Sequence, residues 1–464
     1  MFDQNLYVTR RNSLRTQVGS GLVLFLGNEE SPMNYADNTY HFRQDSTFLY
    51  YFGLDAAGLA AVVDLDESTD TIYGNDLTVE DFVWTGPQPS LREMAAKVGV
   101  ERTETLSGLT ELLARARTQG RRIHFLPPYR PENKLKLQEW LGVRPGQAGS
   151  DASVELIKAV VAQRSVKSPD EIAEIEKAAD VTVDMHLTGM RMARPGVTEA
   201  EIAAAVHRVA LASGGNLAFP IIATVHGEVL HQHAHTGVLR SGGMFLLDAG
   251  AETARHYAAD LSSTVPVDPK FTERQKEIYR ITLAAHEAAK GCLKPGVKHL
   301  ESHLAACRKI AEGLKDLGLM KGETEEAVRR GAHALFFPCG EGHMMGLDVH
   351  DMEDLGEVYV GYEGQPKSTQ FGLKSLRLAR PLQPGFVVTI EPGIYFNSQL
   401  IDQWRAEKKF PEFLDYDRIE AYKEFGGIRN EEDAVITAGG YRILGKKKPL
   451  TIEEVESVAR DLAA

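Results

Sequence analysis

The chain has 464 residues, more than one compact core usually holds, so we expect two domains. Hydrophobic residues make up 43% of it and charged residues 25%, the balance of an ordinary globular protein. The formal net charge of −13 argues against nucleic acid and against an anionic membrane as partners, because both require a basic face.

The cysteines and the N-terminal residues indicate the cellular compartment of the protein. Cys292, Cys307 and Cys339 are too few, and odd in number, for a disulfide framework, which favours a reducing compartment. The first 15 residues carry three arginines and Asp3 without an apolar core, so we expect no signal peptide. The run Leu22–Leu26 is too short to span a bilayer. These features predict a cytoplasmic protein.

The first 150 or so residues are typical of an α/β domain. An amphipathic stretch, Leu106–Thr118, separates short apolar runs that indicate strands at Gly21–Leu26, Leu59–Leu65 and Arg122–Leu126. A glycine-containing loop follows at Arg144–Ser150. We therefore predict an N-terminal domain over residues 1–160 and a second domain over residues 161–464.

Helix signals dominate the start of the second domain. Ser168 can cap a helix, Pro169 suits its first turn, and Glu171 completes a capping box, so a helix is expected up to about Arg194. Further helices are expected from Thr198, from Thr272 to Gly291, over Val297–Leu317, and from Thr451 with Glu454. The stretch Met352–Gln370, rich in Gly, Glu and Tyr, is expected to be an irregular loop that could cover a site.

Several acidic residues stand next to apolar runs that indicate strands. A single acid in such a place is usually a turn residue, so a functional role depends on other motifs. The acids are Asp248 after Met244–Leu247, Asp260 twelve residues later across a predicted hairpin, Glu391 after Phe386–Ile390, and Glu431 just before the run from Asp433 to Thr437.

A histidine motif strengthens this pattern. His343 and His350 stand in the segment from Gly342 to Asp351, and glycine beside His343 lets the backbone pass close to a site. The histidines are seven residues apart, which excludes a helical metal pair with i, i+4 spacing. We interpret one as a metal ligand and the other as a substrate-facing residue.

Together, five ordered motifs resemble the pita-bread metallopeptidases, in particular the prolidase and aminopeptidase P branch. The N-terminal stretch Tyr40–Ser46, followed by Phe48 and Gly53, resembles the companion domain of that branch. The resemblance covers nearly the whole chain and implies an α/β (α+β) fold, with an N-terminal creatinase/aminopeptidase P-like domain and a C-terminal pita-bread catalytic domain. The motifs are Asp248-Ala-Gly, Asp260–Pro266, Gly342–Asp351, Thr389–Gly393 and Arg429–Asp433.

The resemblance also implies two divalent cations, bridged by Asp260 and Glu431. Two like charges about 4 Å apart repel by roughly 4 kcal/mol at an effective dielectric near 20, so four converged carboxylates need compensating charge. A set of oxygen ligands with one imidazole suits manganese, with cobalt or zinc as alternatives. The implied ligands are Asp248, Asp260, His343, Glu391 and Glu431.

The same resemblance assigns catalytic and substrate-binding roles. His231, seventeen residues before Asp248, and His350 are expected to bind substrate and to stabilise the tetrahedral intermediate. Glu391 is expected to carry a proton to the leaving proline nitrogen. The alternation in His231-Gln-His233-Ala-His235 would put three histidines on one face of a strand, and a separate zinc site there is a less favoured alternative.

The segment from Gly372 to Pro384 resembles prolidases more than bacterial aminopeptidase P. There Arg377 would grip the carboxylate of a dipeptide through two hydrogen bonds, unless Arg377 and Arg380 are surface charges. Arg429 is expected to support the site and, with Arg377 and His231, to belong to the substrate-binding set. These features predict a Xaa-Pro dipeptidase for small peptides with proline second, and the family resemblance implies a homodimer. An Xaa-Pro aminopeptidase and a non-catalytic pita-bread binding protein are the alternatives.

One position departs from the family pattern. Cys339 stands where relatives usually carry a histidine, four residues before His343. A thiol cannot replace a cationic imidazole at neutral pH. We expect the difference to affect rate, substrate preference or pH dependence.

Overall fold

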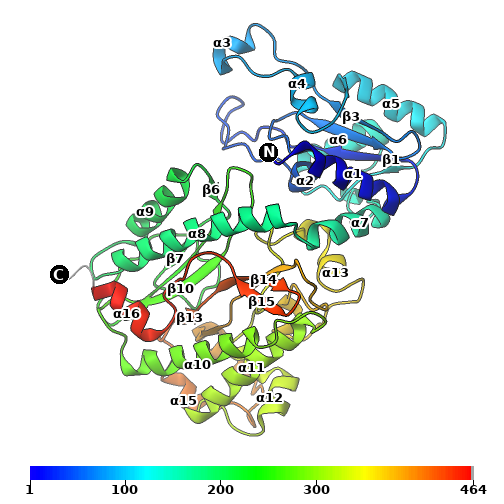
Figure 1. Cartoon of the computed structure of the whole chain (residues 1–464). Coiled ribbons are helices and arrows are strands. Elements are labelled where there is room, and N and C mark those ends of the chain that lie inside the picture. The colour runs from blue at the N-terminus through cyan, green and yellow to red at the C-terminus, as the bar shows by residue number, and fades with distance from the viewer. Residues whose placement is uncertain (461–464) are drawn as a thin grey trace. The chain divides into compact units, whose positions relative to one another are not determined.

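The computed structural model describes residues 1–460, which form two compact units (Figure 1). The first unit comprises Met1–Arg164 with Met352–Tyr359, and the second comprises Ser165–Asp351 and the residues from Val360 onward. The predicted limits, 1–160 and 161–464, remain a proposal for the domain boundaries. No helix among the described residues is long and apolar enough to cross a membrane.

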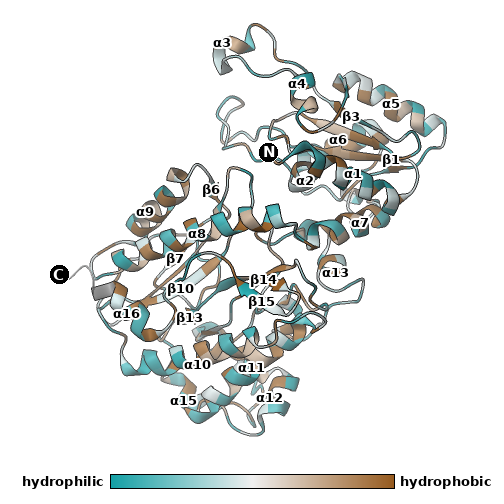
Figure 2. Ribbon diagram, in the orientation of Figure 1, coloured by the Kyte–Doolittle hydropathy of each residue, from teal (hydrophilic) through white to brown (hydrophobic). Residues whose placement is uncertain are grey.

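A five-stranded sheet with the order β4-β3-β2-β1-β5 forms the centre of the first unit. The three apolar runs contain β1, β2 and β5, as predicted, and Figure 2 shows hydrophobic residues along β1. The strands are β1 Leu22–Leu26, β2 Ala60–Asp64, β3 Thr69–Tyr73, β4 Arg102–Glu104 and β5 Ile123–His124. The helices are α1 Gln4–Val18, α2 Ser46–Phe52, α3 Asp81–Thr85, α4 Leu91–Ala96, α5 Leu106–Thr118, α6 Pro131–Leu141 and α7 Val154–Ser165.

Helices of the second unit begin where the capping signals predict. Ser168 with Glu171 and Thr272 with Gln275 form complete capping boxes, each satisfying backbone N–H groups at a helix start. The first of these helices ends at Met192, two residues before the expected end. The helices are α8 Pro169–Met192, α9 Glu199–Ala212, α10 Glu273–Lys290, α11 His299–Asp316, α12 Thr324–Arg330, α14 Ser398–Ala406, α15 Tyr416–Glu420 and α16 Ile452–Arg460, and the short helix α13 Glu357–Val360 lies where the chain passes from the first unit to the second.

Short strands of the second unit lie between α8 and α9 on one side and α10 and α11 on the other, and polar residues cover the outward surface of α10 (Figures 1 and 2). Their sheets have the orders β10-β8-β7, β11-β14-β15, β12-β13 and β6-β9. The strands are β6 Asn216–Leu217, β7 Ile222–Thr224, β8 Met244–Ala249, β9 Ala251–Glu252, β10 Leu261–Pro266, β11 Val387–Ile390, β12 Gly393–Tyr395, β13 Gly427–Arg429, β14 Glu432–Thr437 and β15 Gly440–Ile443.

Two local predictions require correction. The segment from His231 to His235 is not a strand, because the chain turns after β7 and the segment pairs with no neighbouring strand within residues 1–460. A period of two predicts a strand only where such a neighbour supplies hydrogen bonds. The stretch Met352–Gln370 is irregular over most of its length, but it contains a 3₁₀ turn at Glu353–Leu355 and the single-turn helix α13.

Candidate active site

One cavity of about 470 Å³ in the second unit is lined by every residue that the sequence predicted for the site. Its volume lies within the range of small-molecule sites in proteins. The structure therefore brings together groups that are far apart in the chain. They are His231, Asp248, Asp260, His343, His350, Arg377, Glu391, Arg429 and Glu431.

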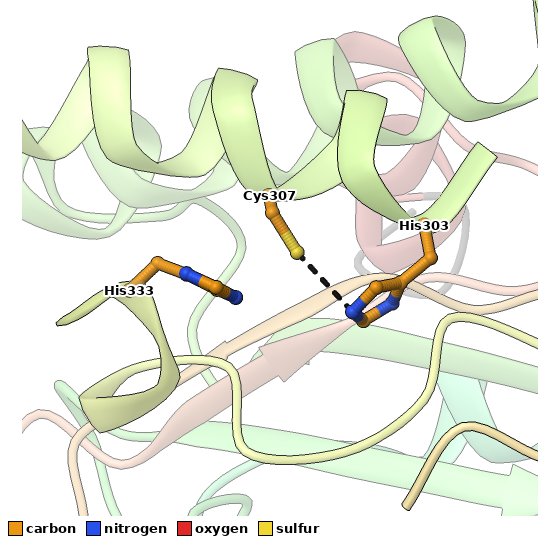
Figure 3. A group of neighbouring side chains, drawn as sticks. All are labelled: His303, Cys307 and His333. Carbon is orange, nitrogen blue, oxygen red and sulfur yellow. Dashed lines mark hydrogen bonds between the residues drawn. The ribbon is translucent and has the colours of Figure 1, made fainter. Parts of the chain in front are cut away.

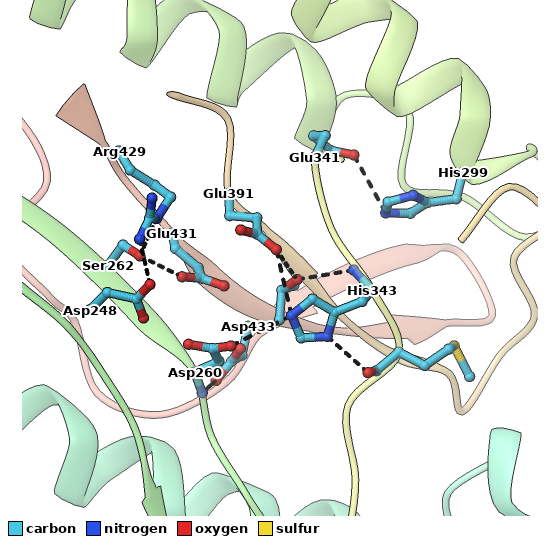
Figure 4. Close-up of polar contacts among 12 residues, drawn as sticks. Asp248, Asp260, Ser262, His299, Glu341, His343, Glu391, Arg429, Glu431 and Asp433 are labelled. Atoms are coloured by element: carbon cyan, nitrogen blue, oxygen red, sulfur yellow. Dashed lines mark hydrogen bonds and ion pairs between the residues drawn. The ribbon is translucent and has the colours of Figure 1, made fainter. Parts of the chain in front are cut away.

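The acidic residues are positioned by strand pairs. Asp248 lies within β8, and Asp260 directly precedes β10, which pairs with β8 in antiparallel register. Glu391 follows β11, and Glu431 directly precedes β14, which pairs with β11. Each pair of strands thus delivers two carboxylates to one place, and Figure 4 shows the four side chains converging.

His343 reaches the carboxylates from a loop that runs beside β11. Its backbone N–H donates to Thr389 Oγ1 over 3.1 Å, and its carbonyl accepts from the Thr389 N–H over 3.1 Å. Its Nδ1 lies 2.9 Å from the Met344 carbonyl, which places the ring proton on Nδ1. Its Nε2 then faces Asp260 Oδ2 and Glu391 Oε1, each 3.5 Å away (Figure 4). This is how a histidine is held when Nε2 binds a metal.

The charges at this site fit bound cations. Burial, and next the neighbouring carboxylates, raise the pKa values of Asp260 and Glu431 well above the ordinary range, and burial also raises the pKa of Asp248. Asp260 Oδ1 and Glu431 Oε1 are buried without a hydrogen-bond partner among the described residues. Ligand atoms of Asp260, His343 and Glu431 lie within 4.8 Å of one another. Divalent cations would satisfy these oxygens and remove the repulsion.

Arg429 connects several of the acidic groups. Its guanidinium forms an ion pair with Asp248, donates from Nε to Ser262 Oγ over 2.9 Å, and donates from one terminal nitrogen to the Tyr395 hydroxyl over 3.1 Å. Ser262 Oγ in turn donates to Glu431 Oε2 over 2.7 Å. Arg429 is only 3% exposed. This geometry favours a positioning role for Arg429 over direct contact with substrate.

The remaining predicted residues line the cavity at different depths. The ring of His350 packs edge-on against that of His343, with centroids 4.4 Å apart. His231 is exposed, and partial desolvation, followed by the charge of Arg429, lowers its pKa. Arg377 is half-buried and follows a 3₁₀ turn at Leu373–Ser375. The cavity therefore offers hydrogen-bond donors and a cation in addition to the carboxylates.

Cys339 also lines the cavity, and burial raises the pKa of its thiol to about 12. The thiol is therefore neutral over the physiological range. His233 lines the cavity as well, whereas His235 bonds through Nε2 to the Ile221 carbonyl over 3.0 Å. That bond separates His235 from the other two histidines and does not favour a zinc site there.

Sequence reasoning missed several supporting groups. Asp433 Oδ2 accepts the Asp260 N–H over 3.0 Å, and the acidic motif around Glu431 contained this signal. Lys448 is buried and donates to Ser263 Oγ over 3.2 Å, and burial lowers its pKa to about 8. Lys448 ends a run of three lysines that is typical of a surface, so no signal could have found it. Glu341, which accepts from Ser302 Oγ over 3.1 Å, lies 3.5 Å from His299 (Figure 4).

Comparisons with known proteins agree with this geometry. The model of metallopeptidase family M24 matches residues 173–438, and that of the aminopeptidase P N-terminal domain matches residues 7–124. The chain is 29% identical to a human Xaa-Pro dipeptidase, over 98% of this chain and 91% of the relative. It is 30% identical to a Xaa-Pro aminopeptidase of Escherichia coli, over 97% of each.

Solved structures show the same likeness. A zinc-substituted E. coli aminopeptidase P in complex with product superposes with a TM-score of 0.79 at 26% identity, over 99% of each chain. The expected mixed α/β architecture is confirmed. The chain is therefore an enzyme of metallopeptidase family M24 that carries an aminopeptidase P-type N-terminal domain.

Proposed function

We propose that this enzyme is a Xaa-Pro dipeptidase, which hydrolyses the bond in front of proline in a dipeptide and requires two divalent cations. The observation that supports this proposal best is the position of Arg377. A guanidinium in the same cavity as the metal-binding carboxylates can receive the terminal carboxylate of a short substrate. An enzyme for longer peptides has no need of a carboxylate receptor there.

In this proposal five residues would hold the two cations. Manganese is the proposed metal, because oxygen ligands predominate and one imidazole is present. When bound, such cations lower the pKa of a water molecule and polarise a carbonyl group. The five residues are Asp248, Asp260, His343, Glu391 and Glu431.

The protein's own groups would then act on the bound peptide. Glu391 takes up the proton of the attacking water and delivers it to the proline nitrogen. His231 and His350 donate hydrogen bonds to the substrate and to the oxygen on which negative charge develops. The lowered pKa of His231 keeps this ring neutral at pH 7, so it donates without adding a full charge.

The cavity also has an apolar part that suits a proline ring. Phe219, Leu230 and Val349 line it beside the histidines. Burying a small apolar ring against such side chains contributes about 25 cal/mol for each Å² removed from water. The apolar part and Arg377 together would favour a substrate that ends in proline.

A Xaa-Pro aminopeptidase acting on longer peptides is the second candidate. The similarity to the E. coli Xaa-Pro aminopeptidase over 97% of each chain supports it. The two activities differ in whether the substrate continues beyond the proline, so peptide length separates them. We also propose, from the family resemblance, that the protein is a homodimer, which gel filtration with light scattering tests. From its composition we propose that it is cytoplasmic, which cell fractionation tests.

Replacing Arg377 with alanine tests the dipeptidase proposal. We expect kcat/KM for Gly-Pro to fall by about 10- to 100-fold, because hydrogen bonds to charged groups contribute roughly 1.5–3 kcal/mol. Activity on a Gly-Pro-Xaa tripeptide should change little. Lys374→Ala is the matched control, since Lys374 lies exposed in the same segment. Equal activity of wild type and Arg377→Ala on Gly-Pro would refute the carboxylate role.

A further inference from the structure

A second group of metal-ligating side chains lies outside the cavity. His303 and Cys307 lie one turn apart on α11, and His333 lies on the 3₁₀ turn Ala332–Leu335 that follows α12. Figure 3 shows the three side chains directed into one space from these two elements. None of the three lines the active-site cavity. The proposed peptidase mechanism uses none of them.

The geometry of this group matches metal ligation. One ligand atom from each residue lies within 4.8 Å of the other two. The separation of Cys307 Sγ and His303 Nε2 is 3.4 Å. Zinc bound tetrahedrally, with Zn–S near 2.3 Å and Zn–N near 2.0–2.1 Å, holds a sulfur and a nitrogen ligand about 3.5 Å apart. The i, i+4 spacing on a helix presents both groups on one face.

Three ring nitrogens of this group lack hydrogen-bond partners among the described residues, whereas Cys307 Sγ and His303 Nε2 form a hydrogen bond with each other (Figure 3). His303 and Cys307 are 0% exposed and His333 is 1% exposed. His303 Nδ1 and both ring nitrogens of His333 form no hydrogen bond with any of the described residues, although the Ala327 carbonyl lies close to the His333 ring. Buried polar groups are normally satisfied, and leaving one unpaired costs about 1–3 kcal/mol. Two histidines in this state in one buried cluster require an explanation.

We propose that His303, Cys307 and His333 bind a Zn²⁺ ion, separate from the cations of the active site, through three of its four tetrahedral positions. The ion would replace the hydrogen bond between Cys307 and His303, would supply a partner for the His333 ring, and would tie α11 to the turn that follows α12. A ligand set of one thiolate and two imidazoles favours zinc over manganese, because manganese prefers oxygen ligands.

Protonation is consistent with this site. Burial lowers the pKa of His303 to about 3 and that of His333 to about 4, so both rings are neutral and can donate a lone pair at neutral pH. Burial raises the pKa of the Cys307 thiol well above its usual value. Binding therefore replaces the S–H bond by an S–Zn bond and releases one proton to solvent, so affinity rises with pH.

Cobalt substitution tests the proposal, because a Co²⁺–thiolate bond has a charge-transfer absorption that oxygen and imidazole ligands do not produce. The full-length protein is freed of metal and titrated with Co²⁺. We expect this absorption in the wild type and its loss in Cys307→Ser, with one fewer ion per chain by mass spectrometry. His333→Asn should also bind one ion fewer. Zn²⁺ should abolish the absorption, because it binds such sites more tightly than Co²⁺.

Cys339→Ser and Cys292→Ser are the matched controls, and both should keep the absorption. The proposal is overturned if the wild type gives no thiolate absorption, if the absorption survives Cys307→Ser, or if it disappears with either control. It is also overturned if Zn²⁺ fails to displace Co²⁺. Circular dichroism checks that each variant is folded. If a variant does not fold, the wild-type titration still shows whether a thiolate ligates the metal. None of these measurements depends on peptidase activity.

Discussion

Replacing Arg429 with lysine keeps the positive charge but removes the planar group that joins Asp248, Ser262 and Tyr395. A lysine ammonium is a single point charge and, from this backbone position, can retain only one of the three partners. Two buried hydrogen bonds are lost, each contributing about 1–1.5 kcal/mol. We therefore expect the free energy of unfolding of the metal-free protein to fall by about 2–3 kcal/mol.

The same substitution should weaken cation binding. Arg429 orients Asp248 directly and Glu431 through Ser262, whose hydroxyl lies 2.7 Å from Glu431 Oε2. Loss of a group that orients metal ligands typically costs 10- to 100-fold in metal affinity, or about 1.4–2.7 kcal/mol. Urea denaturation of the metal-free protein measures the loss of stability, and calorimetric titration with Mn²⁺ measures the loss of metal affinity.

Arg405→Lys is the control, because Arg405 is exposed and pairs with the surface carboxylates of Asp417 and Glu420. We expect it to change stability by less than about 0.5 kcal/mol and to leave Mn²⁺ affinity unchanged. If Arg429→Lys folds and binds Mn²⁺ as tightly as the wild type, then Arg429 does not position the ligands, and the reasoning from its three hydrogen bonds is wrong.

Three further predictions concern the second of the two compact units, which contains the active site. Cys339→His places a group with a pKa near 6.5 where the native thiol is neutral, so the pH profile of kcat/KM should gain an inflection between about pH 5 and 8. In protein freed of metal by a chelator, the raised pKa values of Asp260 and Glu431 mean that the folded state binds more protons than the unfolded state. The free energy of unfolding should therefore fall as pH rises from about 4 towards the raised pKa values. Calorimetry at several pH values measures this fall. Gly342→Ala would put a Cβ 2.2 Å from the Thr389 carbonyl oxygen, and should cost roughly 1–3 kcal/mol in urea denaturation.

Each of these predictions has its own control. Cys339→Ser adds no titrating group and should leave the pH profile unchanged. Excess Mn²⁺ should abolish the fall of stability with rising pH, and persistence of that fall in metal-loaded protein would contradict the electrostatic account. Gly146→Ala adds a Cβ with no atom within 4 Å and should change stability by less than about 0.5 kcal/mol. Equal effects of the two glycine substitutions would show that the contact with Thr389 is unimportant.

Local signals made much of the fold predictable from the sequence. A capping box such as Ser168 with Glu171 acts within one turn, so the start of α8 could be predicted without knowledge of its neighbours. The segment from His231 to His235 was predicted wrongly because a strand depends on a partner elsewhere in the chain. Lys448 was missed for the same reason, since only tertiary packing distinguishes it from the two lysines before it.

The site showed the same division between local and long-range information. Ordered motifs predicted which residues line the cavity, because each motif places a ligand at the end of a strand or in a tight loop. The motifs did not reveal that Arg429 is held by three side chains, since those partners lie on other strands. Nor did they reveal the cluster around Cys307, which joins a helix to a distant turn.

The pairing of β11 with β14 has a consequence for biosynthesis. Glu391 and Glu431 come together only after these two strands have paired, and β14 lies close to the C-terminal end of the chain. The chain up to the end of β14 at Thr437 must therefore have left the ribosome before the four carboxylates can meet. A nascent chain that stops before Glu431 would carry Asp248, Asp260, His343 and Glu391 but not the fifth ligand, so peptide cleavage can begin only after Glu431 and β14 have been synthesised.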